Sequence, residues 1–297
     1  MTTRPVPSQL VVPEGSGLYG QLRSLAGTPR LVFFAGLPGT GKSLLIHQLA
    51  HLAHGAGRTV HLLQWDTARP VFEASPAGLR YPVIDGVTHG AIRKAAGLWV
   101  RPAVLEWARR HPEPEHLLVG ETPLAGNRFI ELAQPQNDAA EPLLTAPATR
   151  FVIPVPSREV RQLLETERAR RALEPLHPRE REDAPPRVLH DLWRELAGVA
   201  VALGVAPAAP APADDGPPYD PDLYRRVYER LLRHRPVGVM PVDARLPTAT
   251  TSVYDFAMAR RDLLPTPEDA TSFIREVERR YPDPRALRRE IDRWYLV

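Results

Sequence analysis

The chain has 297 residues, 43% of them hydrophobic, so it is long enough to bury a sizeable core and does not have the composition of a disordered protein. It contains no cysteine, which excludes disulfides, thiolate metal sites, iron–sulfur clusters and cysteine nucleophiles. A formal charge of +3 is too small to indicate nucleic-acid binding by itself. The first residues lack a signal or transit pattern and the longest apolar run, 196–206, is too short to span a bilayer, so we expect a cytoplasmic protein with no membrane contact.

The first part of the chain predicts a leader followed by a buried strand. Residues 1–29 are rich in Pro, Gly and Ser and indicate an irregular leader, with a short helix near Leu18 to Leu25. Regular structure begins at Leu31, where the continuous apolar run LVFFA is typical of a strand buried on both faces of a parallel sheet. Helical spacing of apolar residues follows from Ser43 to His54.

Strands and helices then alternate along the chain. Three further strands are predicted at Thr59 to Trp65, His116 to Gly120 and Arg150 to Val155, and they end at Asp66, Glu121 and Pro156. Helical patterns lie between them, so we expect an α/β fold with a doubly wound parallel sheet of about five strands flanked by helices.

The second half predicts mostly helices. Ser157 is placed to cap a long charged helix, and an apolar helix follows from about Val188 to Leu203. An Ala/Pro-rich loop occupies 204–220. Residues 221–297 then complete the same domain as a C-terminal helical extension, with a helix capped by Asp220, a fifth strand at Val237 to Val242, and terminal helices opened by Thr266 and Asp283.

Residues 36–43 read GLPGTGKS, which is the phosphate-binding pattern G-x-x-x-x-G-K-[ST] between a predicted strand and a predicted helix. Glycines let the backbone wrap phosphates and point its N–H groups inward, and the following helix adds the positive end of its dipole. Only two of the 38 basic residues are lysines, and one of them, Lys42, stands where the pattern needs a mobile point charge. The motif therefore predicts a P-loop NTPase that binds ATP and Mg²⁺, with the nucleotide held by Gly36, Pro38, Gly39, Thr40, Gly41, Lys42 and Ser43. The alternative is a glycine-rich turn with no ligand.

The second predicted strand ends in WDTAR, and its D-x-x-R, Asp66 and Arg69, resembles the signature of the P-loop kinases that include polynucleotide kinases, zeta-toxin-type kinases and chloramphenicol-phosphotransferase-like enzymes. The resemblance covers about residues 30–203 and resumes at 242–248. It implies that Asp66 accepts the proton of the acceptor hydroxyl and that Arg69 holds phosphate or substrate. A salt bridge between the two side chains is the structural alternative.

The third predicted strand ends in LLVGETPLAGNRFIELA, which is similar to the same group's third strand. Glu121 then stands where an acid orients a Mg²⁺-bound water, so the metal ligands implied are Ser43 and Glu121. Two features depart from the group's pattern: the acid there is more often aspartate, and Gly120 interrupts the apolar run.

Residues 157–187 occupy the position where such kinases carry a mobile arginine-rich lid. Arg168 and Arg171 share a helix face and are the residues we expect to act on phosphate. Acidic residues at helical spacing make a solvated, self-paired helix an equally good interpretation for most of these arginines. On the helix predicted from Ser43 to His54, three histidines form a stripe that could bind Zn²⁺: His47, His51 and His54. No fourth ligand is near in sequence, which favours a polar helix face.

The sequence thus predicts an ATP- and Mg²⁺-dependent kinase that transfers the γ-phosphoryl group to a hydroxyl. Candidate acceptors are a nucleic-acid 5′ end, a nucleoside or nucleotide, and a small molecule, and nothing in the chain chooses among them. The alternatives are a P-loop NTPase that works as a hydrolysis-driven switch and a nucleotide-binding partner without catalysis. A GTPase is disfavoured because the guanine-reading N-K-x-D pattern is absent.

Overall fold

The sheet of this protein has six strands, all parallel, in the order β5-β4-β1-β3-β2-β6. It is described from a computed structural model over residues 10–84, 86–182, 185–207, 217–248, 252–253 and 261–297. The strands are β1 Leu31–Ala35, β2 Thr59–Leu63, β3 His116–Thr122, β4 Thr149–Pro156, β5 Val237–Val242 and β6 Arg261–Asp262. The α/β class, the parallel sheet and the five predicted strands are confirmed, and the sixth strand was not predicted.

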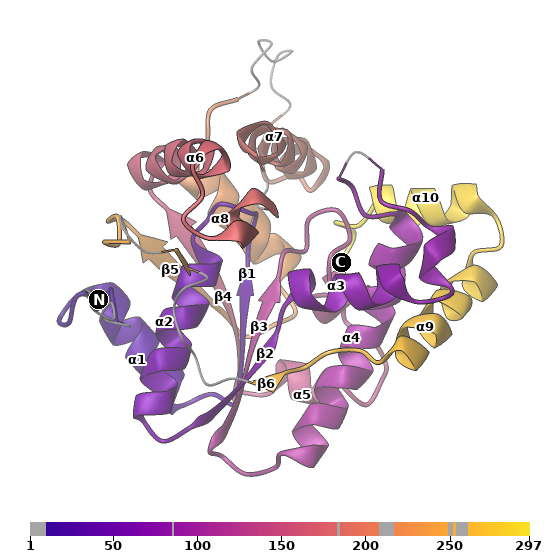
Figure 1. Ribbon diagram of the computed structural model, residues 1–297, viewed down its shortest axis with the longest axis horizontal. Coiled ribbons are helices and arrows are strands. Elements are labelled where there is room, and N and C mark those ends of the chain that lie inside the picture. Colours follow the sequence, from indigo (N-terminus) through magenta and orange to yellow (C-terminus); the bar gives the residue numbers. More distant parts are fainter. Residues whose placement is uncertain (1–9, 85, 183–184, 208–216, 249–251, 254–260) are drawn as a thin grey trace, which may run out of the picture.

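Helices cover both faces of the sheet (Figure 1). Alternate residues of the central strands enter two separate cores: Val32 and Phe34 pack toward α1 and α2, whereas Leu31 and Phe33 pack toward the opposite layer. The helices are α1 Gly17–Gly27, α2 Lys42–Gly55, α3 Trp65–Ala74, α4 Gly90–Arg110, α5 Glu141–Thr145, α6 Arg158–Leu173, α7 Pro186–Ala202, α8 Pro221–Leu231, α9 Pro267–Arg280 and α10 Pro284–Asp292, with short 3₁₀ turns η1 Gly78–Arg80, η2 Ile130–Leu132 and η3 Pro178–Glu182. Both faces of the sheet are therefore buried, as the continuous apolar strands predict.

The predicted helix starts are confirmed by their hydrogen bonds. Ser157 accepts a bond from Val160 N, and Asp220 accepts bonds from the backbone of the first turn of α8. Thr266 forms a capping box with Asp269, and the carboxylate of Asp283 caps α10. The short leader helix is also present, as α1. Local capping signals thus located these helix ends correctly.

The second strand ends earlier than predicted. β2 stops at Leu63, and α3 already begins at Trp65, with Gln64 in an extended conformation before it. Asp66 therefore lies in the first turn of α3 rather than at the end of a strand. A carboxylate in that position is stabilised by the positive end of the helix dipole.

Gly120, which interrupts the apolar run of β3, has a packing reason. A Cβ atom at this position would lie 2.3 Å from Cδ1 of Phe33, which stacks on Phe151 with ring centroids 4.9 Å apart. The absence of a side chain at Gly120 leaves room for Phe33 of the neighbouring strand β1, so the glycine is explained by core packing.

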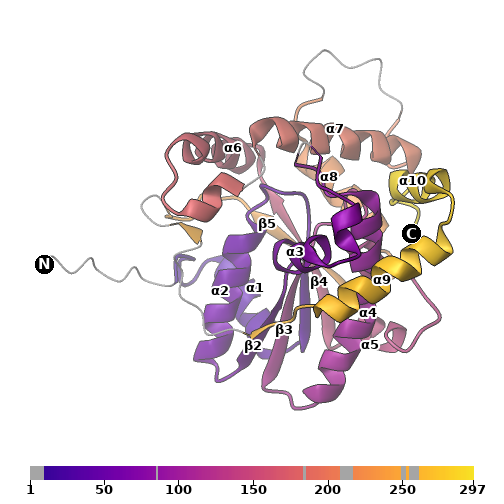
Figure 2. The ribbon, with the colours of Figure 1, turned by 45° about the vertical axis from the view of Figure 1, so that its right-hand side comes forward.

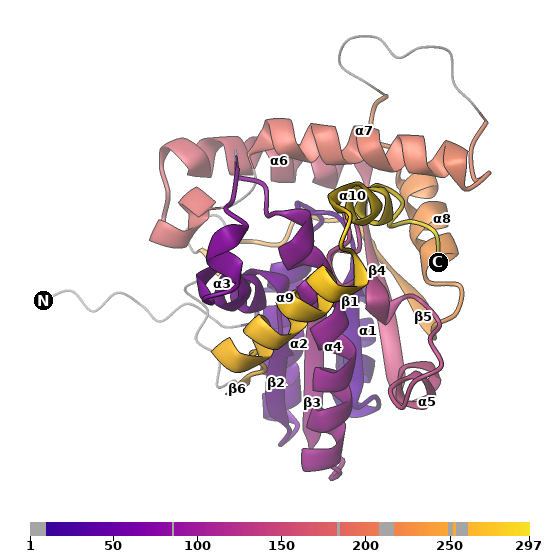
Figure 3. The same ribbon diagram turned by 90° about the vertical axis from the view of Figure 1, so that its right-hand side faces the viewer.

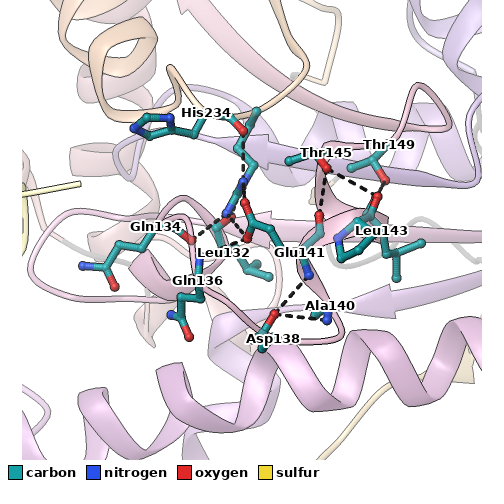
Figure 4. A network of polar contacts seen from close by, with 12 residues as sticks. Leu132, Gln134, Gln136, Asp138, Ala140, Glu141, Leu143, Thr145, Thr149 and His234 are labelled. Carbon is teal, nitrogen blue, oxygen red and sulfur yellow. Dashed lines mark hydrogen bonds and ion pairs between the residues drawn. The ribbon is translucent and has the colours of Figure 1, made fainter.

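Two buried arginines, Arg101 and Arg235, tie the segment after β3 to the rest of the fold. Figure 4 shows the polar contacts of this segment around Glu141. Arg101 binds Asp138 and Glu141 at 2.6 and 2.8 Å, and Arg235 binds Glu141 at 2.7 Å and the carbonyl of Leu132 at 2.6 Å. Burial disfavours ionised Glu141, but hydrogen bonds from Arg235 and Arg101 outweigh it and lower the pKa of Glu141 to about 2. These cations are fully partnered and act as structural ties.

The helices α6 and α7 run across one end of the sheet (Figures 2 and 3). They belong to the predicted lid and the helix after it, while part of the Ala/Pro-rich loop lies outside the described residues. In the part of the chain that the structure describes, no helix combines the length and apolarity needed to cross a membrane.

Candidate functional site

The glycine loop, residues 36–43, follows β1 at the centre of the sheet's carboxyl edge. Gly39 and Gly41 have φ of +76° and +82°, a left-handed backbone that favours glycine. Gly41 is also the N-cap of α2, and no side chain caps that helix. The loop therefore leaves the first N–H groups of α2 available to an anion, at the positive end of the helix dipole.

The conformation of the loop is stabilised by a residue that is distant in sequence. Tyr224 of α8 is fully buried, and its hydroxyl accepts a hydrogen bond of 3.3 Å from Leu37 N. A Cβ atom at Gly36 would lie 2.3 Å from this hydroxyl, so the position requires glycine. Within the loop, the Thr40 hydroxyl donates to Leu37 O at 2.9 Å. Sequence reasoning did not single out Tyr224, because nothing local marks it as a contact of the loop.

Lys42 lies at the centre of the candidate site, where it is 4% exposed. Its ammonium group donates to Leu37 O at 2.8 Å and lies 3.3 Å from Oε1 of Glu121, which follows Gly120 in β3. Burial lowers the pKa of Lys42 in spite of the opposing charges of Glu121 and Asp66. Burial likewise raises the pKa of Glu121 against the opposing charge of Lys42. Each partner is thus only partly compensated by the other.

The charges of Asp66 and Arg168 both act on the pair formed by Lys42 and Glu121. Asp66 raises the pKa of Lys42 and of Glu121, whereas Arg168, from α6, lowers both. Asp66 is exposed at the start of α3. The structure therefore brings four of the residues singled out from the sequence into one charged cluster.

Arg69 lies beside this cluster but is engaged elsewhere. Its guanidinium binds Glu73 at 3.2 Å and the Thr88 hydroxyl at 3.4 Å. Among the described residues no ion pair joins it to Asp66, so the D-x-x-R of this chain is not a local salt bridge. One nitrogen, Nε, is buried without a hydrogen-bond partner.

The two lid arginines predicted from the sequence have different surroundings. Arg171 is buried between two carboxylates, with Glu167 at 2.7 Å and Glu180 at 3.1 Å. This arrangement is the self-paired helix that was the alternative for these arginines. Arg168, one turn earlier, instead acts on the charges of Lys42 and Glu121.

A third lid arginine touches the glycine loop directly. Arg161 is 2% exposed and donates to Pro38 O at 3.0 Å, and it also pairs with Glu165 at 2.6 Å. A Cβ atom at Gly39 would lie 3.2 Å from its Nη1 and 3.1 Å from Leu189 of α7. The segment over the loop is therefore packed against it in this structure.

The segment that follows β3, residues 123–129, has an unusual backbone. Leu124, Asn127 and Phe129 have φ of +59°, +62° and +60°, a conformation that side chains seldom adopt. Asn127 is 1% exposed, and within the described segments neither its amide nitrogen nor its amide oxygen has a hydrogen-bond partner. A buried and unpartnered amide costs about 1–3 kcal/mol, and such strain is concentrated at functional sites.

Two arginines meet around this segment. Arg93 of α4 donates to Gly126 O at 2.6 Å, and Arg128 donates to Ala125 O at 2.9 Å. A Cβ atom at Gly126 would lie 3.1 Å from Nη1 of each, so the two guanidiniums approach the same point. Burial and the neighbouring charge of Arg128 lower the pKa of Arg93 to about 10. No carboxylate in the described segments forms an ion pair with either arginine.

This pair of arginines belongs to the same electrostatic neighbourhood as Asp66. Burial lowers the pKa of Arg128, the charges of Glu195 and then Asp66 raise it, and Arg69 lowers it, so these side chains interact. Arg93, Asn127 and Arg128 were not among the residues predicted from the sequence. The Gly-Asn pair after a buried strand is the signal that could have done so, because both residues favour a left-handed backbone.

The arrangement has the chemical parts needed to hold a metal-bound polyphosphate. Lys42 gains from an added anion and Glu121 gains from an added cation, because each is only partly compensated now. Ser43 lies in the first turn of α2, partly exposed, where its hydroxyl suits a hard cation such as Mg²⁺. The residues present therefore fit both groups. Comparison with protein-family models, with curated proteins and with solved structures gave no match.

Proposed function

We propose that this protein is an ATP- and Mg²⁺-dependent kinase that transfers the γ-phosphoryl group to a hydroxyl of an anionic acceptor. The glycine loop and Lys42 hold the phosphates, and Ser43 and Glu121 hold the metal ion. Asp66 accepts the proton of the attacking hydroxyl, and Arg168 closes over the phosphates from the lid.

The observation that carries the proposal is the unbalanced pair of Lys42 and Glu121 at an uncapped helix N-terminus. The two groups lie 3.3 Å apart and are almost fully buried, yet burial still lowers the pKa of Lys42 and raises that of Glu121. A buried ion pair that leaves both partners short of opposite charge is costly to a fold that uses it only as a tie. Both costs fall when the lysine meets phosphate and the carboxylate meets a cation.

The residues of the site then perform one transfer. The acceptor oxygen attacks the γ-phosphorus, the bond from that phosphorus to the β,γ-bridging oxygen breaks, and ADP leaves. The hydroxyl proton passes to the carboxylate of Asp66, which is exposed and free to face the acceptor. Bound Mg²⁺ supplies neutralisation of the phosphate charge. Positioning and charge neutralisation do most of the work, as is general for phosphoryl transfer.

We infer an anionic acceptor from the positions of Arg93 and Arg128. Their guanidiniums meet at Gly126, and no carboxylate of the described residues forms an ion pair with them, although the charges of Glu195 and of Asp66, the proposed base, act on Arg128. Asn127 adds a buried amide whose hydrogen-bonding capacity is unused. A phosphate or carboxylate on the acceptor would satisfy all three groups through charge-assisted hydrogen bonds. An NTPase without an acceptor has no use for this second cationic site.

The test is transfer of label from γ-labelled ATP with Mg²⁺ to matched pairs of acceptors. Each pair contains a neutral hydroxyl compound and its phosphorylated counterpart: nucleoside and nucleotide, sugar and sugar phosphate. We expect the label on the anionic member of at least one pair, and we expect Arg128→Gln to raise the KM for that acceptor about 10- to 100-fold with little change in kcat.

Arg279→Gln is the matched control, because this arginine of α9 is exposed and, among the described residues, its ion pair is with Glu276 on its own helix. Labelled inorganic phosphate with no labelled acceptor would favour the hydrolytic switch. Binding of ATP without any turnover would favour a nucleotide-binding partner. Preference for the neutral member of the pairs would overturn the assignment of Arg93 and Arg128 while leaving the kinase intact.

A further inference from the structure

Three histidines from separate elements converge near the amino edge of the sheet, away from the glycine loop. His61 lies in β2, His111 is the C-cap of α4, and His116 is the first residue of β3. One ring nitrogen of each lies within 4.8 Å of the others, and Nε2 of His61 is 3.1 Å from Nδ1 of His116. In the described part of the chain, these three histidines are the group of metal-binding side chains that lie close enough to share a metal ion.

The geometry of the three rings suits a tetrahedral ion. A Zn²⁺ ion with bonds of about 2.0–2.1 Å holds its nitrogen ligands about 3.3 Å apart. The three nitrogens lie within 4.8 Å of one another and the ring centroids are separated by 4.4, 4.5 and 5.2 Å, so a bound ion would draw the nitrogens closer together. His61 is buried while His111 and His116 are partly exposed, which leaves a path for the ion from solvent.

The surroundings hold the rings in place. The carboxylate of Glu113 lies 3.8 Å from Nε2 of His116, on the ring nitrogen that does not face His61. A hydrogen bond from that side is the usual way of orienting a ligating histidine, and Glu113 would have to move closer than 3.8 Å to form it. Arg30 donates to the backbone oxygen of His111 and lies over Trp107, which fixes the end of α4.

The hydrogen bond between His61 and His116 does not by itself account for the convergence of three rings. A hydrogen bond between two neutral imidazoles uses one nitrogen of each and leaves the third ring, His111, without a role in it. A shared ion uses all three rings.

We propose that His61, His111 and His116 bind one Zn²⁺ ion, with solvent at the fourth position. Three imidazoles and no oxygen ligand favour Zn²⁺ over Mg²⁺ or Ca²⁺. The guanidinium of Arg261 acts on His61 and His111 and opposes a cation, so affinity comes from the three coordinate bonds. The ion joins β2, β3 and the end of α4, and stabilises the end of the sheet opposite the nucleotide site.

This site replaces the helical histidine stripe as the candidate for zinc. His47, His51 and His54 lie along α2 and, among the described residues, are not a group that could share an ion. In the converging cluster, His111 and His116 follow His61 by 50 and 55 residues. The proposal does not depend on nucleotide binding, because none of its ligands belongs to the glycine loop.

The experiment is a calorimetric Zn²⁺ titration of the full chain without an affinity tag, after treatment with a chelator. We expect one Zn²⁺ per chain and a higher thermal midpoint in its presence. His111→Ala and His116→Ala should each weaken binding by more than about 10- to 100-fold, the loss that follows removal of an outer-sphere partner alone. Both residues are partly exposed, so both variants are expected to fold.

His54→Ala, an exposed histidine of α2, is the matched control and should bind as tightly as the unaltered protein. Lys42→Ala should also retain the zinc affinity. Far-ultraviolet circular dichroism of each variant without metal separates loss of a ligand from loss of the fold. If folded His111→Ala and His116→Ala bind Zn²⁺ with unchanged affinity, or if the unaltered protein binds none, the three histidines are a packing cluster and the proposal is wrong.

Discussion

The two lysines of this chain lie in similar places, yet their surroundings balance their charges in opposite ways. Lys42 and Lys94 are both buried beside a glutamate, at 3.3 Å from Glu121 and 3.0 Å from Glu131. Lys94 has a second carboxylate at 2.8 Å, that of Glu290, and its pKa is raised despite burial, whereas the pKa of Lys42 is lowered. The two cations therefore differ in charge balance rather than in burial, whereas burial raises the pKa of both partner glutamates, Glu121 and Glu131.

The backbone around the two lysines differs in the same sense. A Cβ atom at Gly97 would lie 1.9 Å from the carboxylate of Glu131, so α4 is packed directly against the partner of Lys94. A Cβ atom at Gly41, just before Lys42, would meet nothing within 4 Å. The same contrast separates Arg101 and Arg235, which are saturated by carboxylates, from the Arg93 and Arg128 pair.

Lys42→Ala is expected to have the largest effect of the substitutions considered, a loss of phosphoryl transfer. Removing the charge should reduce phosphoryl transfer by at least about 10²–10³-fold, since it removes a buried electrostatic contact to the reacting phosphate. Stability should fall as well, because Glu121 is left buried without its partner cation. Single-turnover transfer assays and thermal unfolding measure the two effects. Strong destabilisation with normal transfer would mean that Lys42, like Lys94, is a structural residue.

Asp66→Asn should have the next largest effect and should act on rate alone. The amide keeps the shape of the carboxylate but cannot accept the proton, so we expect transfer to slow by about 10²–10⁴-fold. ATP affinity should be nearly intact, because Asp66 is exposed and interacts with Lys42 only through its charge. The equivalent amide substitution at Glu73, seven residues later on α3, is the control. A normal rate in Asp66→Asn would remove the proposed base.

Lys94→Met is expected to lower the stability of the fold. It leaves Glu131, which is 1% exposed, buried without its cation, and breaking such a pair costs about 3–5 kcal/mol. Denaturant unfolding measures the loss, and the double variant with Glu131→Gln should recover much of it. Phosphoryl transfer by the folded fraction should remain. Equal stability of the single variant and the unaltered protein would show that Lys94 does not hold the fold.

The smallest effect concerns pH and the saturated arginines. The pKa of Glu141 falls from 4.5 to about 2 on folding, so its contribution is present above pH 4.5 and is lost as the pH falls toward 2. Because the carboxylate is partly exposed, we expect at most about 3 kcal/mol from this residue. The measurement is the free energy of unfolding of the unaltered protein and of Glu141→Gln from pH 6 to pH 2. A difference between them that does not shrink with acid would contradict the role of this ion pair.

Local patterns predicted the order of strands and helices and the starts of several helices, because caps and periodicity are properties of short segments. Ser157, Asp220, Thr266 and Asp283 act as the sequence indicates. The sixth strand was missed because it has only two residues, Arg261–Asp262, and no pattern fits in that length.

The parts of the site that were missed depend on contacts between distant segments. Arg93 and Arg128 meet across 35 positions of the chain, and Tyr224 reaches Leu37 across 187. The three converging histidines are likewise brought together by the sheet and by the return of α4 toward β3. A search for helical spacing found the stripe on α2 instead, because it is sensitive only to residues on one element.

The central claim, that Lys42 is held ready for a phosphate, is tested most directly by a calorimetric titration of ATP with Mg²⁺ into the unaltered protein, Lys42→Ala and Lys94→Arg. The arginine variant keeps the second buried cation, so it should bind like the unaltered protein. We predict a marked loss of ATP affinity in Lys42→Ala alone. Unchanged affinity in Lys42→Ala, with the protein folded, would contradict the account and would leave the glycine loop as a turn between a strand and a helix.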